Sequence, residues 1–115
     1  MSNSKQWLIM ISGGGENPAL AFKGGLDLAL AAGAMGQHVS LAFSGQGLDL
    51  LHASPNQVSD TYRLLGSAPF YDIKQIYAVY EGEATLPLRT DIPIALMSAH
   101  AWQAAIASHD VVVNY

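Results

Sequence analysis

The chain has 115 residues, a formal net charge of −4 and no cysteine. This length predicts a single domain, residues 1–115, that can bury a core without disulfides or metal ions. The lack of cysteine excludes a disulfide framework, a thiolate metal site and any thiol chemistry on this chain. Only 12% of the residues are charged and half are hydrophobic. Because a small domain cannot hide that much apolar surface alone, we expect partner chains to cover part of it.

The charge pattern also limits the kinds of partner. The five basic residues are spread along the chain, at Lys5, Lys23, Arg63, Lys74 and Arg89. They form no cluster suited to a phosphate backbone, so direct nucleic-acid binding is not expected. The longest uncharged run, 28–48, contains glycine, glutamine and histidine and does not predict a membrane span. The polar start of the chain predicts no signal peptide, and the expected location is the cytoplasm.

Apolar segments alternate with helical ones throughout the chain. The predicted strands are Trp7–Ile11, His38–Phe43, Gln75–Tyr80, Ile94–Met97 and Asp110–Asn114. Strands that alternate with helices are typical of parallel sheets with helical crossovers. The sequence therefore predicts a three-layer α/β fold: a mostly parallel five-stranded sheet with helices on both faces.

The first predicted helix begins at Asn17-Pro18, with asparagine as the N-cap and proline in the first helical position. It runs to about Met35 and ends at Gly36. Its polar stripe is narrow, so we expect this helix to pack on the sheet and on another element as well. The pair Gly24-Gly25 would let that element approach closely.

Three further helical segments are predicted. A short one covers Leu48–Leu51. The sequence Ser54-Pro55-Asn56-Gln57 has the pattern of a capping box and predicts a helix from there to about Leu65. Ser98 is expected to cap a last helix over Ala99–Ala107.

Two glycine-rich breaks follow the first two predicted strands. Ligand sites of parallel sheets lie at the carboxyl ends of the strands, where both breaks fall. The third strand ends beside them, so the candidate ligand-binding residues are Gly13, Gly14, Gly15, Ser44, Gly45, Gly47, Tyr80 and Glu81. A bound dinucleotide is disfavoured, because Pro18 replaces the third glycine of the fingerprint and no acidic residue ends the second strand. The alternative for Gly13–Gly15 is a plain tight turn.

No catalytic residue is assigned. The four histidines are not spaced like a metal pair, and neither a metal nor a cofactor is expected. Glu81 and Glu83 form either an acid/base pair or a solvated loop, and His100 is the one histidine near a carboxyl strand end. The chain is therefore not expected to be an enzyme on its own. Four aromatic residues are either interface anchors or core residues: Tyr71, Tyr77, Tyr80 and Trp102.

Four segments, taken together, carry a family resemblance. They are the small-residue helix and strand of Ala19–Phe43, the glycine- and leucine-rich stretch Ser44–Leu51, the pair Leu64-Leu65 followed by Phe70-Tyr71-Asp72-Ile73, and the terminal His109–Tyr115. In this order and spacing the chain resembles the DsrE/DsrF-like sulfur-relay proteins from Trp7 to Tyr115, most closely the TusC/DsrF-type subunit.

The resemblance implies a flavodoxin-like domain in an assembly of three related subunits, two copies of each. A sister subunit would carry persulfide sulfur on a cysteine near the end of its third strand, for tRNA wobble-uridine thiolation or dissimilatory sulfur oxidation. The corresponding region here, Ala78-Val79-Tyr80-Glu81, has no cysteine. The implied role is that of a non-catalytic subunit that supports persulfide transfer by its sister. The alternative is a stand-alone, homo-oligomeric protein of the same fold that binds a small ligand.

Overall fold

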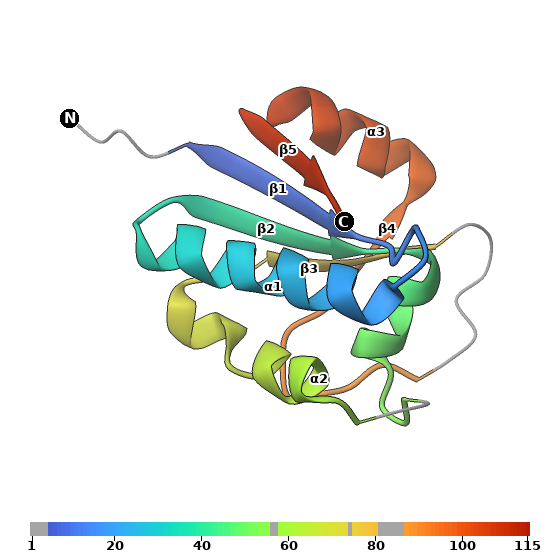
Figure 1. The fold of residues 1–115 in the computed structure, drawn as a ribbon. Helices are drawn as coiled ribbons and strands as arrows, with labels where there is room; N and C mark the ends of the chain where they lie inside the picture. Colours follow the sequence, from blue (N-terminus) through green and yellow to red (C-terminus); the bar gives the residue numbers. More distant parts are fainter. Residues whose placement is uncertain (1–4, 56–57, 74, 81–86) are drawn as a thin grey trace.

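A computed structural model describes residues 5–55, 58–73, 75–80 and 87–115. The five strands are β1 (Gln6–Ile11), β2 (His38–Phe43), β3 (Gln75–Tyr80), β4 (Ala95–Ser98) and β5 (Val111–Asn114). They form one sheet in the order β4-β3-β2-β1-β5, and every neighbouring pair is parallel (Figure 1). This confirms the predicted α/β fold of the flavodoxin-like kind.

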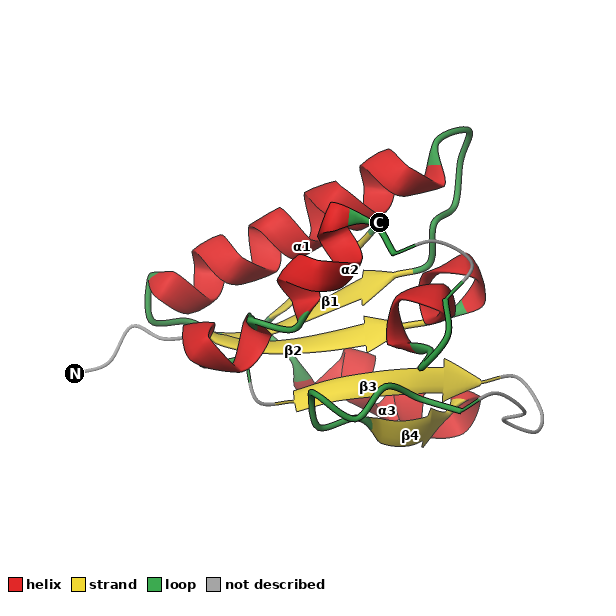
Figure 2. Ribbon diagram, turned by 90° about the horizontal axis from the view of Figure 1, so that it is seen from below, coloured by secondary structure: helices red, strands yellow, loops and turns green. Residues whose placement is uncertain are grey.

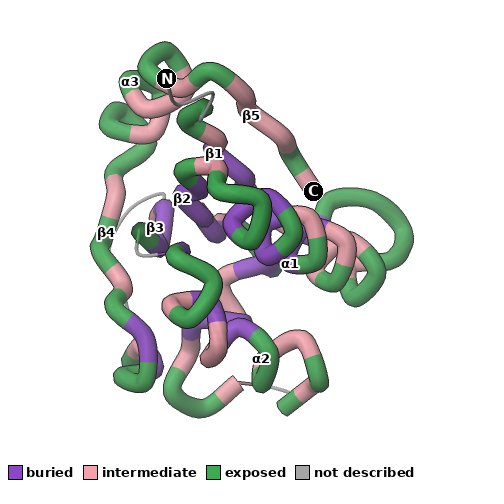
Figure 3. Tube along the Cα trace, turned by 90° about the vertical axis from the view of Figure 1, so that its left-hand side faces the viewer, coloured by how far each residue is buried: buried purple, intermediate pink, exposed green. Residues whose placement is uncertain are grey.

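The helices cover the two faces of the sheet unequally. On one face lie α1 (Pro18–Ala34), α2 (Asp60–Leu65) and the 3₁₀ segments η1 (Gly45–Leu51) and η2 (Ala68–Tyr71), while α3 (Ala99–Ser108) lies on the other (Figures 2 and 3). Strands β1 to β4 follow one another across the sheet, and the chain then returns past β1 to β5. Connections between parallel strands are right-handed. When the chain reverses the direction in which it crosses the sheet, the connecting helix therefore lies on the opposite face.

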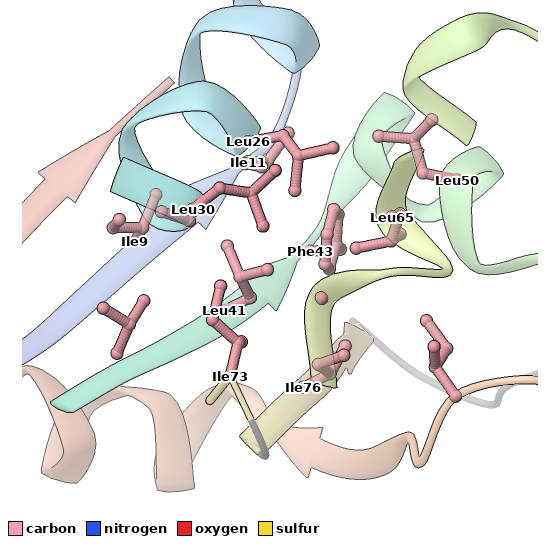
Figure 4. Packing of buried hydrophobic residues seen from close by; sticks show 14 of the residues in the cluster. Ile9, Ile11, Leu26, Leu30, Leu41, Phe43, Leu50, Leu65, Ile73 and Ile76 are labelled. Atoms are coloured by element: carbon pink, nitrogen blue, oxygen red, sulfur yellow. The ribbon is translucent and has the colours of Figure 1, made fainter. Parts of the chain in front are cut away.

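Successive side chains along each strand point to opposite faces of the sheet, so the core has two parts. On the α1 face, Leu26 and Leu30 of α1 pack over Ile9, Ile11 and Leu41 of the sheet (Figure 4). On the α3 face a smaller cluster is built on four buried residues: Leu8, Met10, Ala42 and Val79. The strands are apolar on both faces, as expected for a buried parallel sheet.

Helix α1 follows the sequence prediction closely. The Asn17 side chain accepts a hydrogen bond from the Leu20 N–H at 3.1 Å, and the helix ends before Gly36, whose φ is +86°. The additional packing expected for this helix is supplied by its own chain. A Cβ at Gly33 would strike the main-chain oxygen of Tyr71 in η2, and one at Gly25 would lie 3.2 Å from the Tyr115 ring.

The prediction that the next helix starts at Ser54 is wrong. Helix α2 begins at Asp60, and the Ser59 hydroxyl is its cap, accepting from the Tyr62 N–H at 3.1 Å. The reason is a pairing distant in sequence: the Ala53 N–H donates to Pro87 O at 2.9 Å, and the Arg89 N–H donates to Leu51 O at 2.8 Å. This short antiparallel contact holds His52 extended, directly before the capping pattern, so the chain is not in a helical course when it reaches Ser54.

Candidate functional site

A pocket of about 570 Å³ opens on the α3 face at the carboxyl ends of the strands. Its apolar lining comes from four elements: Met10 of β1, Leu48 of η1, Val79 of β3 and Trp102 of α3. Polar side chains are fewer, and the described lining residues with fully polar side chains are Ser44 and Gln103. Predominantly apolar concavities of this size with a few polar groups are typical of small-molecule sites.

The structure brings part of the predicted site to this pocket. Ser44, Gly45 and Tyr80 line it, as expected from their positions at the ends of β2 and β3. Glu81 and Glu83 lie outside the described residues. The other predicted glycines, Gly13, Gly14, Gly15 and Gly47, are not among the described residues of the lining.

The start of the first glycine break is hydrogen-bonded to another part of the chain. The N–H groups of Ser12 and Gly13 donate to the main-chain oxygen of Tyr115, at 2.8 and 3.2 Å, and the Ser12 hydroxyl donates to the same atom at 3.1 Å. Backbone N–H groups after a strand can bind an anion only if they are free. These two N–H groups instead join the loop after β1 to the end of β5.

Gly47 allows two segments of main chain to approach closely. Its N–H donates to Ser44 O at 2.9 Å and lies 3.3 Å from Ser12 O. A Cβ at this position would collide with the carbonyl group of Ile11. Only glycine can therefore stand where η1 crosses the end of β1, and this role requires no ligand.

Tyr80 faces two environments. Its ring packs against the larger core cluster, and its hydroxyl is buried without a hydrogen-bond partner among the described residues. Burial raises the pKa of this hydroxyl above its ordinary value, so it stays protonated at neutral pH. An orphaned buried hydroxyl costs free energy, which a bound water or a ligand group would recover.

A second, smaller pocket lies beside η1. It has a volume of about 320 Å³ and is lined by Phe22, Gln46, Asp49 and His52, among others. The Nδ1 of His52 lies 3.6 Å from a carboxylate oxygen of Asp49. His100, in the first turn of α3, is exposed and is not among the described residues of either pocket. No group of three metal-ligating side chains occurs in the described ranges.

Arg89 is a buried cation that the sequence analysis did not single out. Its guanidinium donates to both carboxylate oxygens of Asp91, each at 2.7 Å, and to the carbonyl oxygens of Leu50 and Tyr62 at 3.1 and 2.8 Å. It also lies 3.9 Å from the centre of the Tyr62 ring. The hydrogen bond from Arg89 is the main cause that lowers the pKa of the Asp91 carboxyl. These contacts bind the segment before β4 to η1 and α2.

Comparison with models of known protein families finds no match to this chain. Comparison with curated proteins finds none either. No described helix combines the length and the apolar character needed to cross a membrane.

The sequence analysis predicted only some of the residues that line the pocket on the α3 face. Ser44, Gly45 and Tyr80 could be placed because they end predicted strands. Trp102 and Gln103 were missed as site residues, since nothing in a helical pattern says which turn will lie over a strand end. Chemically, the described lining can hold a molecule, but it offers no paired nucleophile and base.

Proposed function

We propose that this chain is a non-catalytic subunit of a sulfur-relay assembly of DsrE/DsrF-like chains. Its partners would be related subunits, one of which carries persulfide sulfur for tRNA thiolation or for sulfur oxidation. One observation carries the proposal: a chain that resembles this family, and has the α/β parallel-sheet fold the resemblance implies, contains no cysteine. The proposal includes a cytoplasmic location, because tRNA, one of the implied sulfur acceptors, is a cytoplasmic molecule.

The chemistry of persulfide transfer supports the non-catalytic role. A persulfide is a sulfur atom bonded to a cysteine sulfur, and its transfer begins with attack by a thiolate. The third strand ends here in Tyr80, whose hydroxyl cannot carry sulfur. This chain would therefore shape or hold the assembly while a sister subunit carries the sulfur.

Exposed apolar side chains support the expectation of partners. Leu20 in α1 is 65% exposed, Met35 at its end is 79% exposed, and Phe70 in η2 is 89% exposed. Single exposed apolar residues are ordinary, but these occur in a chain with only 12% charged residues. Leu30 of the same helix is buried, so substitutions that test the interface belong at Leu20 and Phe70.

The experiment is to measure the native mass of the chain expressed alone and then together with the products of its neighbouring genes. A mixed assembly that contains a cysteine-bearing relative is expected, and Leu20→Glu or Phe70→Glu should weaken it. Ala107→Glu, at an exposed position of α3 on the other face of the sheet, is the matched control and should leave the assembly intact. A homo-oligomer that does not bind the products of the neighbouring genes would contradict the proposal.

A second candidate function is a stand-alone, homo-oligomeric protein that binds a small ligand. The observation that favours it is the 570 Å³ pocket at the carboxyl ends of the strands. The two functions are separated by the same mass measurement, since only the relay subunit requires cysteine-bearing partners.

A further inference from the structure

The geometry points to the pocket on the α3 face as a binding site for a small, uncharged molecule with a planar ring. This inference deepens the second candidate function, on which it rests, by naming the class of ligand. It is independent of the sulfur-relay proposal, because it concerns only the described walls of the pocket. It rests on three properties of those walls: their volume, their charge and the types of side chain that form them.

The volume fits a whole small molecule. A pocket of about 570 Å³ lies within the range of roughly 300–1,000 Å³ that is usual for ligand sites. Its floor is formed by the side chains of Met10 and Val79, which belong to the core of the sheet and are almost fully buried. A ligand would therefore rest on the strands of the sheet, beneath the wall that α3 supplies.

The charge of the walls selects an uncharged ligand. None of the described residues that line the pocket is charged. A charged group that enters would find no opposite charge among the described lining residues to offset the hydration that it loses, which disfavours its binding. The lining does offer hydrogen-bonding groups at Ser44, between β2 and η1, and at Gln103 of α3. They can anchor a ligand through one or two polar atoms.

The apolar side chains favour a ring. Trp102 lines the pocket from α3, and an indole packs well against another planar ring. Met10 lies on the floor, and its thioether both adapts to irregular shapes and makes favourable contacts with aromatic rings. An aromatic group on one wall and a thioether on the floor suit a flat apolar ligand better than a sugar or a flexible chain.

The test uses indole as the uncharged probe and indole-3-acetate as its charged counterpart. Binding is followed by NMR, through the side-chain N–H resonance of Trp102. We expect indole to shift this resonance with a dissociation constant of about 1 mM or below, as is reasonable for so small a ligand. Indole-3-acetate, with the same ring, should bind at least ~10-fold more weakly.

Two substitutions on α3 form a matched pair. Ala99 is exposed and lines the pocket, so Ala99→Trp should fill it and weaken indole binding at least ~10-fold. Ala107 is exposed on the same helix and is not among the described lining residues, so Ala107→Trp should leave binding unchanged.

Equal binding of indole by the two variants, or an unshifted Trp102 resonance on addition of indole, would overturn the site. Equal affinity for both probes would overturn the preference for uncharged ligands. Neither result bears on the native-mass test of the relay proposal, so the two can fail separately.

Discussion

The guanidinium of Arg89 holds the carboxylate of Asp91 through two hydrogen bonds of 2.7 Å, although the two residues are only two positions apart. The Arg89 side chain is 6% exposed, whereas that of Asp91 is half exposed. A buried cation is therefore paired with a carboxylate at the surface, while its remaining donors bind carbonyl groups of η1 and α2.

Replacing this cation should be costly. Arg89→Ala removes the donors to Asp91, Leu50 and Tyr62, and it empties a packed position. We expect the free energy of unfolding to fall by about 3 kcal/mol, which urea denaturation would measure. The matched control is Arg63→Ala, because Arg63 is 67% exposed and its pair with Asp60 lies at the surface. A change of less than about 0.5 kcal/mol is expected there. Equal effects of the two substitutions would contradict this account of Arg89.

The Asp91 pair also makes stability depend on pH. The pKa of the Asp91 carboxyl is lowered in the folded protein, chiefly by the hydrogen bond from Arg89. The stabilisation is therefore fully present above the unfolded pKa of about 3.9 and is lost as the pH falls through the lower folded value. We expect native protein to lose stability below about pH 4 more steeply than the Asp91→Asn variant. Parallel curves for the two proteins in urea denaturation from pH 7 to 3 would refute this.

Two glycines near the predicted site should respond oppositely to alanine. Gly47→Ala forces a methyl group into the carbonyl of Ile11, and we expect a loss of about 2 kcal/mol or more. At Gly14 the nearest atom to an added Cβ is the Ser12 Oγ, 3.9 Å away. Gly14→Ala should therefore be neutral or slightly stabilising, because it restricts the unfolded chain. Thermal denaturation of both variants measures these changes in stability. A destabilised Gly14→Ala protein would contradict the prediction and indicate a constraint at Gly14 that the packing does not reveal.

Removal of two different tyrosine hydroxyls should change stability in opposite directions. Tyr80→Phe removes a buried hydroxyl that has no partner among the described residues, so stability should rise by about 1 kcal/mol. Tyr62→Phe removes a hydroxyl that donates to His52 O at 2.8 Å, and stability should fall by about the same amount. If Tyr80→Phe is instead destabilising, the hydroxyl has a partner in solution, such as a bound water.

The strands and α1 could be predicted because their signals are local. Apolar runs such as His38–Phe43 and Gln75–Tyr80 form strands with the bounds expected. The Asn17-Pro18 start of α1 and the Ser98 cap of α3 depend only on side chains a few residues apart. These features were confirmed because no distant segment competes with them.

What could not be predicted depends on segments far apart in the sequence. The residues directly before the capping pattern at Ser54 pair with 87–89, and the helix begins only at Asp60. The N–H groups of Ser12 and Gly13, at the start of the first glycine break, donate to Tyr115, more than a hundred positions away. The candidate pocket likewise joins Met10 to Trp102. In each case local chemistry allows two outcomes, and a tertiary contact selects one.

The unequal cover of the two sheet faces has a consequence for hydrogen exchange. On one face, α1 is anchored by Leu26, Ala29 and Leu30, whereas α3 on the other has no buried residue at all. A segment with few buried contacts opens at a lower free energy than the molecule unfolds. The amides of α3 should therefore exchange through local opening, long before those of β1 and β2. Each opening would uncover Met10 and Val79 while the rest of the sheet stays folded, so the floor of the pocket would meet solvent intermittently in the native protein.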